Sequence, residues 1–216
     1  MLEPCDTTYE VHVTLAGIDP PIWRAFTVPA DIGLGHLHLV IQVTMGWLNS
    51  HLHEFRLGRR RFAPPNPYGD DFGDKIEDEA NYQLCELLNR PKQNLVYTYD
   101  FGDGWEHKVT LAAIRPVRCR APKVLAGKRA CPPEDCGGPG GYYDLLAVLA
   151  NPDDPEHAER KEWVPAGFDA EVYPISEVIE RMAGGVSGLA KNYGVFGDWD
   201  EEEGDKNVIQ FPKGGP

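Results

Sequence analysis

The chain has 216 residues, of which 42% are hydrophobic and 25% are charged, and these values are ordinary for a globular protein. They exclude a wholly disordered chain. The 34 acidic residues outnumber the 21 basic ones and give a formal charge of −13. A field of this sign disfavours nonspecific binding to the phosphates of nucleic acid. The composition therefore favours a protein partner or a small ligand over DNA or RNA.

Nothing in the sequence directs the chain to a membrane or out of the cell. No run approaches the roughly 18 apolar residues that a membrane-spanning helix needs. Residues 1–6 contain neither a basic nor an apolar segment, so they do not resemble a signal peptide. Five cysteines, an odd number, in a chain without an export signal favour reduced thiols. We therefore expect a cytoplasmic protein.

The first part of the chain predicts a hairpin, a helix and a third strand. Alternation of apolar and polar residues is typical of a half-buried strand, and apolar residues at helical spacing predict a helix with one apolar face. The expected elements are, in order, a strand over 8–15, a strand over 22–28, a helix from Leu37 to Met45 that ends at Gly46, a strand over 51–57 and a long loop over 58–79.

The second part of the chain predicts two more strands and then helices. The expected elements are a short helix at 84–88, strands over 95–101 and 105–113, an irregular segment over 115–141, helices over 142–150 and after Asp154, and a last helix over 175–182. Because strands and helices are not regularly interleaved, the pattern predicts an α+β fold with a mostly antiparallel sheet and flanking helices. We expect a single domain over 1–183 and a loosely ordered acidic C-terminal extension over 184–216.

The strongest local motif lies at 97–107, where Asp-Gly joins two aromatic-rich runs, a typical hairpin signal. If Asp103 and Gly104 form a two-residue turn, Asp100 lies directly opposite His107, with β-carbons about 4.5–5.5 Å apart. The carboxylate could then orient the imidazole and leave its other nitrogen for a proton or a metal. Alternatively, Asp103 only makes the turn and the Asp100–His107 pair only holds the hairpin together.

A second motif is the pair His51 and His53. Alternate residues on a strand share a face, so the two imidazoles could chelate one divalent ion. In the alternative interpretation, one histidine is buried and hydrogen-bonded while the other lies at the entry of the strand. His38 and His107 are further candidate partners.

A third motif, at 130–138, combines two prolines, two acidic residues and two cysteines. It predicts a rigid, exposed turn that presents Glu134 and Asp135, whose carboxylates suit hard cations. Arg24 could pair with one of these acids or bind an anion. A separate hypothesis places zinc on the thiols of Cys119, Cys131 and Cys136, although their spacing is looser than that of ordinary zinc ribbons.

Six short motifs follow one another along the chain: Pro-Pro-Ile-Trp-Arg at 20–24, Leu-His at 37–38, Met-Gly-Trp at 45–47, His-Leu-His-Glu-Phe at 51–55, Tyr-Asp-Phe-Gly-Asp-Gly-Trp-Glu-His at 99–107 and Pro-Pro-Glu-Asp-Cys-Gly-Gly at 132–138. From about residue 8 to about residue 180, the chain resembles the plasmid pRiA-type ORF-3-like family. Members are also known as passenger proteins of an insertion-sequence transposon, a mobile element. The resemblance implies a single α/β roll and leaves the activity unassigned. It also implies that seven polar residues matter, namely His51, His53, Asp100, Asp103, His107, Glu134 and Asp135.

Two functional hypotheses follow, and the sequence does not decide whether the protein is an enzyme. The first is a binding or accessory protein with a polar groove of His, Asp and Glu side chains. The second is a metal-dependent hydrolase, with a divalent metal such as zinc as its cofactor. Its metal ligands would be His51, His53 and His107, and its catalytic candidates are Asp100, His107, Glu134 and Asp135. Convergence of these side chains in one pocket would favour the hydrolase.

Overall fold

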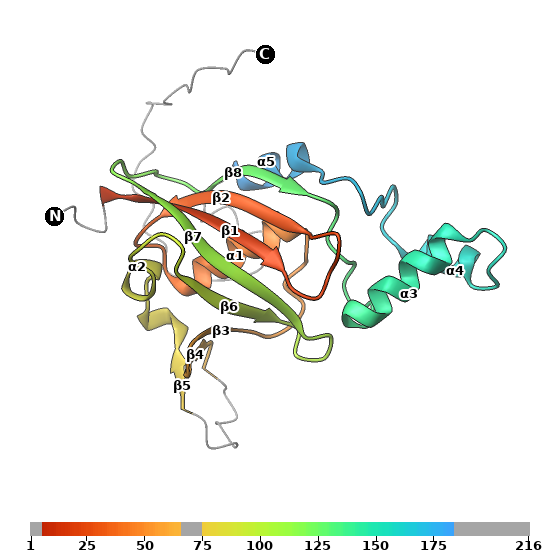
Figure 1. Ribbon diagram of the computed structural model, residues 1–216, viewed down its shortest axis with the longest axis horizontal. Coiled ribbons are helices and arrows are strands. Elements are labelled where there is room, and N and C mark those ends of the chain that lie inside the picture. The colour runs from red at the N-terminus through yellow and green to blue at the C-terminus, as the bar shows by residue number, and fades with distance from the viewer. Residues whose placement is uncertain (1–5, 66–74, 184–216) are drawn as a thin grey trace, which may run out of the picture.

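The computed structural model describes residues 6–65 and 75–183. Within them the chain forms an eight-stranded sheet with the order β5-β4-β3-β6-β7-β1-β2-β8. Neighbouring strands are antiparallel except for β4 and β5, which are parallel. Helices flank the sheet, so the structure confirms the predicted α+β fold with a mostly antiparallel sheet (Figure 1).

The elements follow one another along the chain with these bounds. The strands are β1 Thr8–Leu15, β2 Trp23–Pro29, β3 His53–Leu57, β4 Arg60–Ala63, β5 Ile76–Asp78, β6 Asn94–Tyr99, β7 Trp105–Arg115 and β8 Lys123–Lys128. The helices are α1 Leu34–Met45, the short 3-10 helix η2 Glu79–Asn81, α2 Leu84–Leu87, α3 Gly138–Ala150, α4 His157–Trp163 and α5 Ile175–Met182. Among the described residues, no helix combines the length and the apolar character needed to cross a lipid bilayer.

Three short strands were not expected from the sequence. The segment 58–79, predicted as a loop, contains β4 and β5, and the segment 115–141, predicted as irregular, contains β8. β5 and β8 are the two edge strands of the sheet, and β4 lies between β5 and β3. Pairing with a neighbour, rather than an alternating apolar pattern, determines these short strands. The acidic extension predicted over 184–216, like residues 66–74 of the predicted loop, lies outside the described residues.

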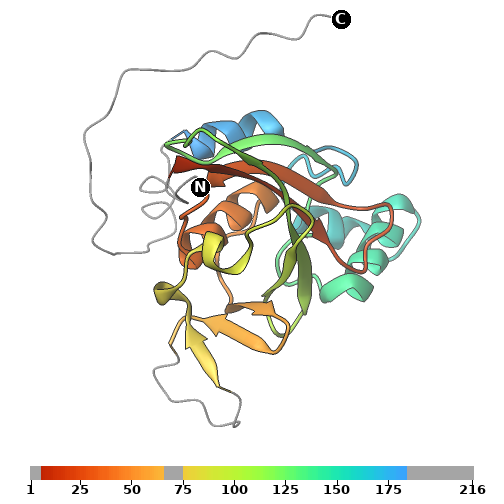
Figure 2. The same ribbon diagram turned by 60° about the vertical axis from the view of Figure 1, so that its left-hand side comes forward.

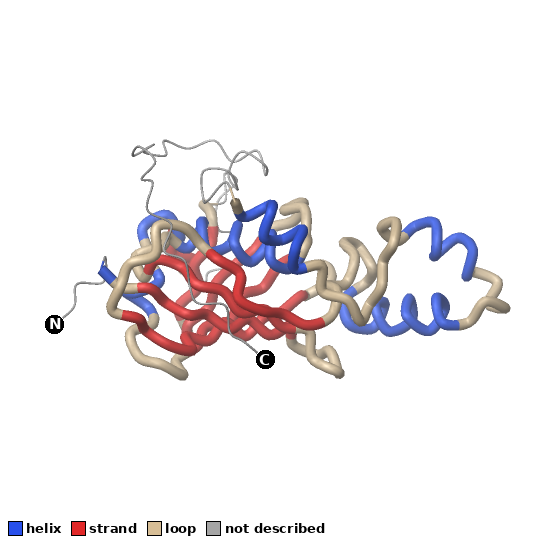
Figure 3. The backbone as a smooth tube through the Cα atoms, turned by 90° about the horizontal axis from the view of Figure 1, so that it is seen from above, coloured by secondary structure: helices blue, strands red, loops and turns tan. Residues whose placement is uncertain are grey.

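Helix α1 lies in the concave side of the curved sheet, which wraps around it (Figure 2). Ten of its twelve residues are buried, whereas the periodicity predicted a helix with a single apolar stripe. As predicted, the helix ends at Gly46, whose left-handed backbone has a φ of 98°. The inward side chains of β1, β6 and β7 alternate with outward polar ones and pack around it. By contrast, α3 and α4 form a pair that stands away from the sheet (Figure 3).

Arg24 ties the C-terminal end of α1 to two strands. Its guanidinium is fully buried; Nε donates to the carbonyl of Thr44 at 2.7 Å, and Nη1 donates to the carbonyls of Trp23 and Lys128 at 2.9 Å each. The group also lies over the ring of Tyr173, 4.0 Å from its centroid. A positive charge at this position complements the partial negative charge of a helix C-terminus. Arg24 therefore has a structural role in place of the acid partner or anion that the sequence allowed.

Replacement of Arg24 by methionine should lower the free energy of unfolding by about 3 kcal/mol, because it leaves buried carbonyl oxygens without their donors. Urea unfolding of the two proteins measures this difference. Arg56 is the matched control, since its exposed side chain pairs with Glu106 at 3.2 Å on the surface. Arg56→Met should cost less than about 1 kcal/mol. Equal losses in the two variants would contradict the structural role of Arg24.

Candidate functional site

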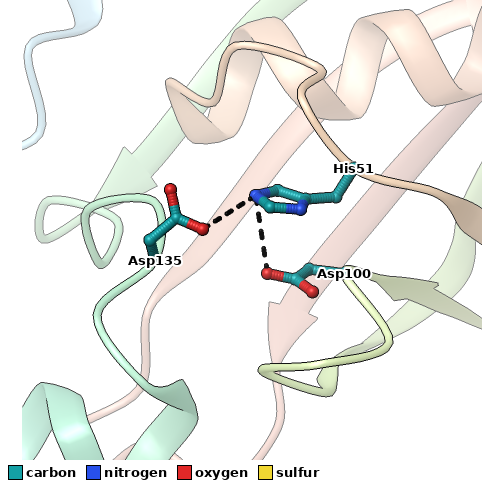
Figure 4. Close-up of side chains that lie close together, drawn as sticks. All are labelled: His51, Asp100 and Asp135. Atoms are coloured by element: carbon teal, nitrogen blue, oxygen red, sulfur yellow. Dashed lines mark ion pairs between the residues drawn. The ribbon is translucent and has the colours of Figure 1, made fainter.

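Three loops that are far apart in the sequence meet at one end of the sheet. They are residues 46–52 after α1, residues 100–104 between β6 and β7, and residues 131–137 before α3. Each loop contributes one side chain to a group made of His51, Asp100 and Asp135 (Figure 4). Their ligand atoms all lie within 4.8 Å of one another, and no other trio of His, Cys, Asp or Glu side chains in the described segments meets this distance.

Glu134 lies beside this trio, close to His51 but outside the set whose ligand atoms are all within 4.8 Å of one another, and we refer to His51, Asp100, Glu134 and Asp135 as the acidic cluster. The Nε2 atom of His51 lies 3.1 Å from Oδ1 of Asp135, 3.3 Å from Oε2 of Glu134 and 3.6 Å from Oδ2 of Asp100. Asp100 and Glu134 are largely buried, whereas the side chain of Asp135 is 70% exposed. Asp135 therefore forms the solvent side of the acidic cluster.

The hydroxyl group of Tyr99, the last residue of β6, connects two of the loops. It accepts hydrogen bonds from the backbone N–H groups of Ser50, at 2.9 Å, and His51, at 3.3 Å. It also lies 3.0 and 3.1 Å from the two oxygens of Glu134 and donates to that carboxylate. Burial, together with the neighbouring Glu134, raises the pKa of Tyr99, so the phenol keeps the proton that it donates.

The loop that carries Asp100 is a turn built around its own carboxylate. The residue adopts a left-handed backbone with a φ of 55°, and its side-chain Oδ1 accepts the N–H groups of Gly102 at 2.9 Å and Asp103 at 3.3 Å. Its backbone N–H donates to the carbonyl of Leu52 at 2.9 Å, which joins this loop to the first one. The other carboxylate oxygen, Oδ2, is left facing His51.

Close contacts hold the third loop against the other two loops. The N–H of Gly137 donates to Oδ2 of Asp103 at 3.1 Å, and the indole N–H of Trp47 donates to the carbonyl of Pro132 at 3.0 Å. A β-carbon on Gly138 would lie 2.5 Å from the carbonyl oxygen of Asp103, and Gly138 also has a φ of +67°. Only glycine fits such a position, so this residue allows Glu134 and Asp135 to reach the site.

In Asp100 and in Glu134, one carboxylate oxygen accepts hydrogen bonds from backbone N–H groups and the other oxygen faces His51. In Asp100 the oxygens are divided between backbone N–H groups and the imidazole, as described above. In Glu134, Oε1 accepts the N–H of Leu48 at 2.7 Å and Oε2 lies nearer to His51. Backbone donors therefore orient both groups toward one point before any ligand binds, which is a typical arrangement around metal-binding carboxylates.

The predicted pairing of Asp100 with His107 across the hairpin is wrong. In the structure Tyr97 lies opposite His107 and Tyr99 lies opposite Trp105, so the connecting loop has five residues, 100–104. The prediction assumed a turn of two or four residues. The turn made by the side chain of Asp100 lengthens the loop, removes Asp100 from the strand and changes the register.

His51 and His53 do not share a face of a strand, because β3 begins only at His53. The ring of His53 is buried and stacks on that of His38, with 3.5 Å between the centroids. Its Nε2 atom lies 3.0 Å from Oε2 of Glu79. One histidine is thus buried and hydrogen-bonded while the other precedes the strand, which is the alternative that the sequence left open.

His107 lies in the core and away from the acidic cluster. It is fully buried, its Nδ1 donates to the carbonyl of Tyr97 at 3.2 Å, and its ring meets that of Trp47 edge-on. Burial lowers the pKa of His107 to about 3, so the imidazole is neutral at physiological pH. The structure therefore does not gather His51, His53 and His107 into one ligand set.

The three cysteines of the alternative zinc site also do not form a metal-ligand set within the described residues. The four cysteines described are free, as expected for reduced thiols. Burial raises the pKa of Cys131, and it raises that of Cys136 to about 12, so both favour the thiol over the thiolate that zinc requires. The N–H of Cys119 donates to the hydroxyl of Thr8, beside the start of β1.

Sequence reasoning missed two groups that organise the acidic cluster. Tyr99 was visible only as an inward position of an alternating strand, and the role of the Leu48 backbone N–H leaves no trace in a side-chain pattern. Asp103, which the resemblance included, supports the site through Gly137 and does not belong to the acidic cluster itself.

The fold and the acidic cluster define an α+β protein with a preformed group of one imidazole and three carboxylates at the end of its sheet. The chain matches the family model described as plasmid pRiA4b ORF-3-like protein over residues 7–177, and it belongs to this family.

Two relatives extend this assignment. The chain is 40% identical to the protein named "Uncharacterized protein y4hQ" of Sinorhizobium fredii (strain NBRC 101917 / NGR234) over 155 residues, which cover 71% of this chain and 78% of the relative. The crystal structure of a protein of unknown function, MM3350 from Methanosarcina mazei Go1, superposes with a TM-score of 0.71 at 32% identity. That match covers 80% of this chain and 97% of the other.

The low pKa of His107 predicts a specific acid sensitivity of folding. Between the usual histidine pKa of about 6.5 and the folded value of about 3, the unfolded chain binds a proton that the folded chain does not, so stability falls as the pH falls through this window. His107→Asn keeps a side-chain N–H for the Tyr97 carbonyl but cannot titrate. The stability advantage of the wild type over this variant should shrink by about 1.4 kcal/mol per pH unit between pH 6 and 4.

Urea unfolding of both proteins at several pH values measures this difference. The same comparison between pH 7.5 and 8.5 is the control, since His107 is then neutral in both states and the difference should stay constant. Parallel stability curves from pH 8 to 4 would show that burial does not suppress the protonation of His107.

Proposed function

We propose that the chain is a cation-dependent binding protein in which the acidic cluster holds one divalent metal ion. The observation that carries this proposal is the convergence of three carboxylate oxygens, at 3.1, 3.3 and 3.6 Å, on the Nε2 atom of His51. A single imidazole N–H can donate to one of them. Among the described residues, Nε2 has no hydrogen-bond partner of acceptable geometry despite these neighbours.

The separations of the carboxylate oxygens from Nε2 of His51 fit ligands that share an ion, and the ligand atoms of His51, Asp100 and Asp135 also lie within 4.8 Å of one another. Metal–ligand bonds of about 2.0–2.2 Å place neighbouring ligand atoms about 3.0–3.6 Å apart in tetrahedral or octahedral geometry. Three carboxylates in one small volume also repel one another, at a cost on the order of a few kcal/mol for each close pair at a protein surface. A divalent cation at their centre would replace that repulsion with attraction.

The ligand types favour certain cations over others. Imidazole nitrogen suits Zn²⁺, Fe²⁺ and similar ions, and carboxylate oxygen suits Mg²⁺, Ca²⁺ and Mn²⁺. A set with one imidazole nitrogen and the carboxylates of Asp100 and Asp135, with Glu134 beside them, is therefore best matched to Zn²⁺ or Mn²⁺. The zinc-binding role predicted from the sequence is kept, with Asp100, Glu134 and Asp135 in place of His53 and His107 as partners of His51.

Isothermal titration of the purified protein with Zn²⁺ and with Mn²⁺ tests the site. We expect one equivalent to bind to the wild type and the affinity to fall at least about 10-fold in Asp100→Asn and in Asp135→Asn, because each variant loses a charged ligand. Asp144→Asn on α3 is the matched control, since Asp144 is an exposed acid outside the acidic cluster. Its affinity should equal that of the wild type.

His53→Ala and Cys136→Ala distinguish the proposed ligand set from those predicted from the sequence. Both variants should bind the cation as the wild type does, provided that circular dichroism shows them folded. A wild-type protein without metal affinity would end the proposal. Loss of metal binding in Cys136→Ala, with metal binding intact in Asp100→Asn, would show that the cysteines bind the cation instead.

A metal-dependent hydrolase is the second candidate function, and the exposure of Asp135 favours it. A carboxylate on the open side of a bound cation is placed to accept a proton from a water molecule that the cation activates. The binding role needs no such chemistry and fits the separation of the three histidines. The family's association with mobile elements and the cytoplasmic location stay predictions.

An ester assay separates the two candidates. A hydrolase should release p-nitrophenol from p-nitrophenyl hexanoate after metal is added to chelator-treated protein. At a metal concentration that saturates both proteins, Asp135→Asn should lower that metal-dependent rate at least about 100-fold through loss of the base. Asp144→Asn is again the control. Equal rates in Asp135→Asn and the wild type would reject the hydrolase and leave the binding function.

A further inference from the structure

The loops that form the acidic cluster also expose large apolar side chains. Leu48 is 68% exposed, Leu52 69% and Phe101 54%, which makes them three of the four most exposed large apolar residues in the described part of the chain. We call these three residues the apolar rim. Isolated exposed apolar residues are common on protein surfaces, but several beside one polar site indicate a place where something binds.

The backbone connects each member of the apolar rim to the acidic cluster. The N–H of Leu48 donates to Glu134 at 2.7 Å, and the carbonyl of Leu52 accepts the N–H of Asp100 at 2.9 Å. Phe101 directly follows Asp100. The apolar rim and the acidic cluster therefore lie on the same joined loops, and a ligand of the cluster would lie close to the rim.

The charge of the site limits the ligand that can enter. A divalent cation with a neutral imidazole and three carboxylates carries a net charge of −1, and the whole chain carries −13. This field repels phosphates, nucleotides and carboxylates. A neutral oxygen donor such as an amide carbonyl can approach the cation without this penalty.

The size of the apolar rim limits the ligand further. Aromatic and aliphatic side chains of this kind bury on the order of 100–200 Å² each, so three of them supply a few hundred Å². A stable protein complex buries about 800 Å² on each partner. On its own, the apolar rim therefore matches the chain of a small molecule.

We propose that the site binds a small uncharged molecule in which an amide-type carbonyl lies next to an apolar chain. The carbonyl oxygen takes an open position on the cation, and the chain lies against Leu48, Leu52 and Phe101. This inference rests on the proposed cation site, because the cation is what binds the carbonyl.

Proton relaxation in Mn²⁺-loaded protein tests the proposal, since a bound Mn²⁺ ion shortens the relaxation times of ligand protons that come near it. The probes are hexanamide, acetamide and hexanoate. We expect hexanamide to half-saturate at a concentration about 10-fold or more below that of acetamide, because each fully buried CH₂ group adds roughly a factor of four in affinity. Hexanoate should bind at least 10-fold more weakly than hexanamide.

Variants assign the apolar contribution to the rim. Leu52→Ser and Phe101→Ser should bind Mn²⁺ as the wild type does but lose most of the preference for hexanamide over acetamide. Leu125→Ser on β8 is the matched control, since Leu125 is exposed on a different part of the sheet and should leave the preference unchanged.

Each result decides a separate point. Equal half-saturation by hexanamide and acetamide, or tighter binding of hexanoate, would overturn the inference while the cation site stands. Unchanged preference in Leu52→Ser and Phe101→Ser would also overturn it. Absence of Mn²⁺ binding, measured by the electron paramagnetic resonance signal of free Mn²⁺, would overturn the proposed function and this inference with it.

Discussion

The burial of α1 on nearly every side determines much of the rest of the structure. A buried helix cannot leave its polar side chains to water, so they must find partners inside the protein. Nδ1 of His38 accepts a hydrogen bond from the hydroxyl of Tyr97, at 2.7 Å, and Gln42 donates to the same hydroxyl at 2.9 Å. The side chain of Asn49 contacts His38, and the backbone N–H of Asn49 donates to the side chain of Gln42. The loop after α1 is thereby fixed, and His51 follows two residues later.

Local turns, and not the strands themselves, bring the acids of the cluster together. A strand spaces its side chains regularly and alternates their direction, so three carboxylates from one strand cannot point at one atom. The loops that carry Asp100 and Glu134 are shaped by hydrogen bonds to backbone N–H groups, which orient one oxygen of each carboxylate. Those hydrogen bonds also offset part of the repulsion between the acids, because N–H groups carry partial positive charge.

Periodicity predicted most of the fold because the core strands alternate clearly and the helix ends carry recognisable residues. The strand over 8–15, the end of α1 at Gly46 and the last helix all follow from local pattern. The edge strands β5 and β8 do not, since β5 pairs with β4 across the long predicted loop and β8 pairs with the distant β2. The pattern also missed β4, which forms a hairpin with β3. For the site, the sequence correctly indicated a turn at residues 134–135, but only Asp135 is exposed there, whereas the side chain of Glu134 is largely buried.

The partners of His51 could not be predicted, because the register of the β6–β7 hairpin depends on hydrogen bonds made by one side chain. A loop of five residues in place of two or four separates Asp100 from His107 and leaves Asp100 free to face His51. Similarly, the partner of His53 is Glu79, 26 positions along the chain and beyond the reach of any local pattern.

Gly138 and Gly141 provide no ligand atom, yet the site depends on the absence of a side chain at both positions. A β-carbon on Gly141 would lie 1.9 Å from the carbonyl oxygen of Cys136, so a side chain there would force the 131–137 loop open, just as one on Gly138 would push it off the hairpin. A relative could keep all four polar residues and still have lost the arrangement through one added methyl group. When relatives are sorted by capacity to assemble this centre, these two small residues are therefore more informative than the acids.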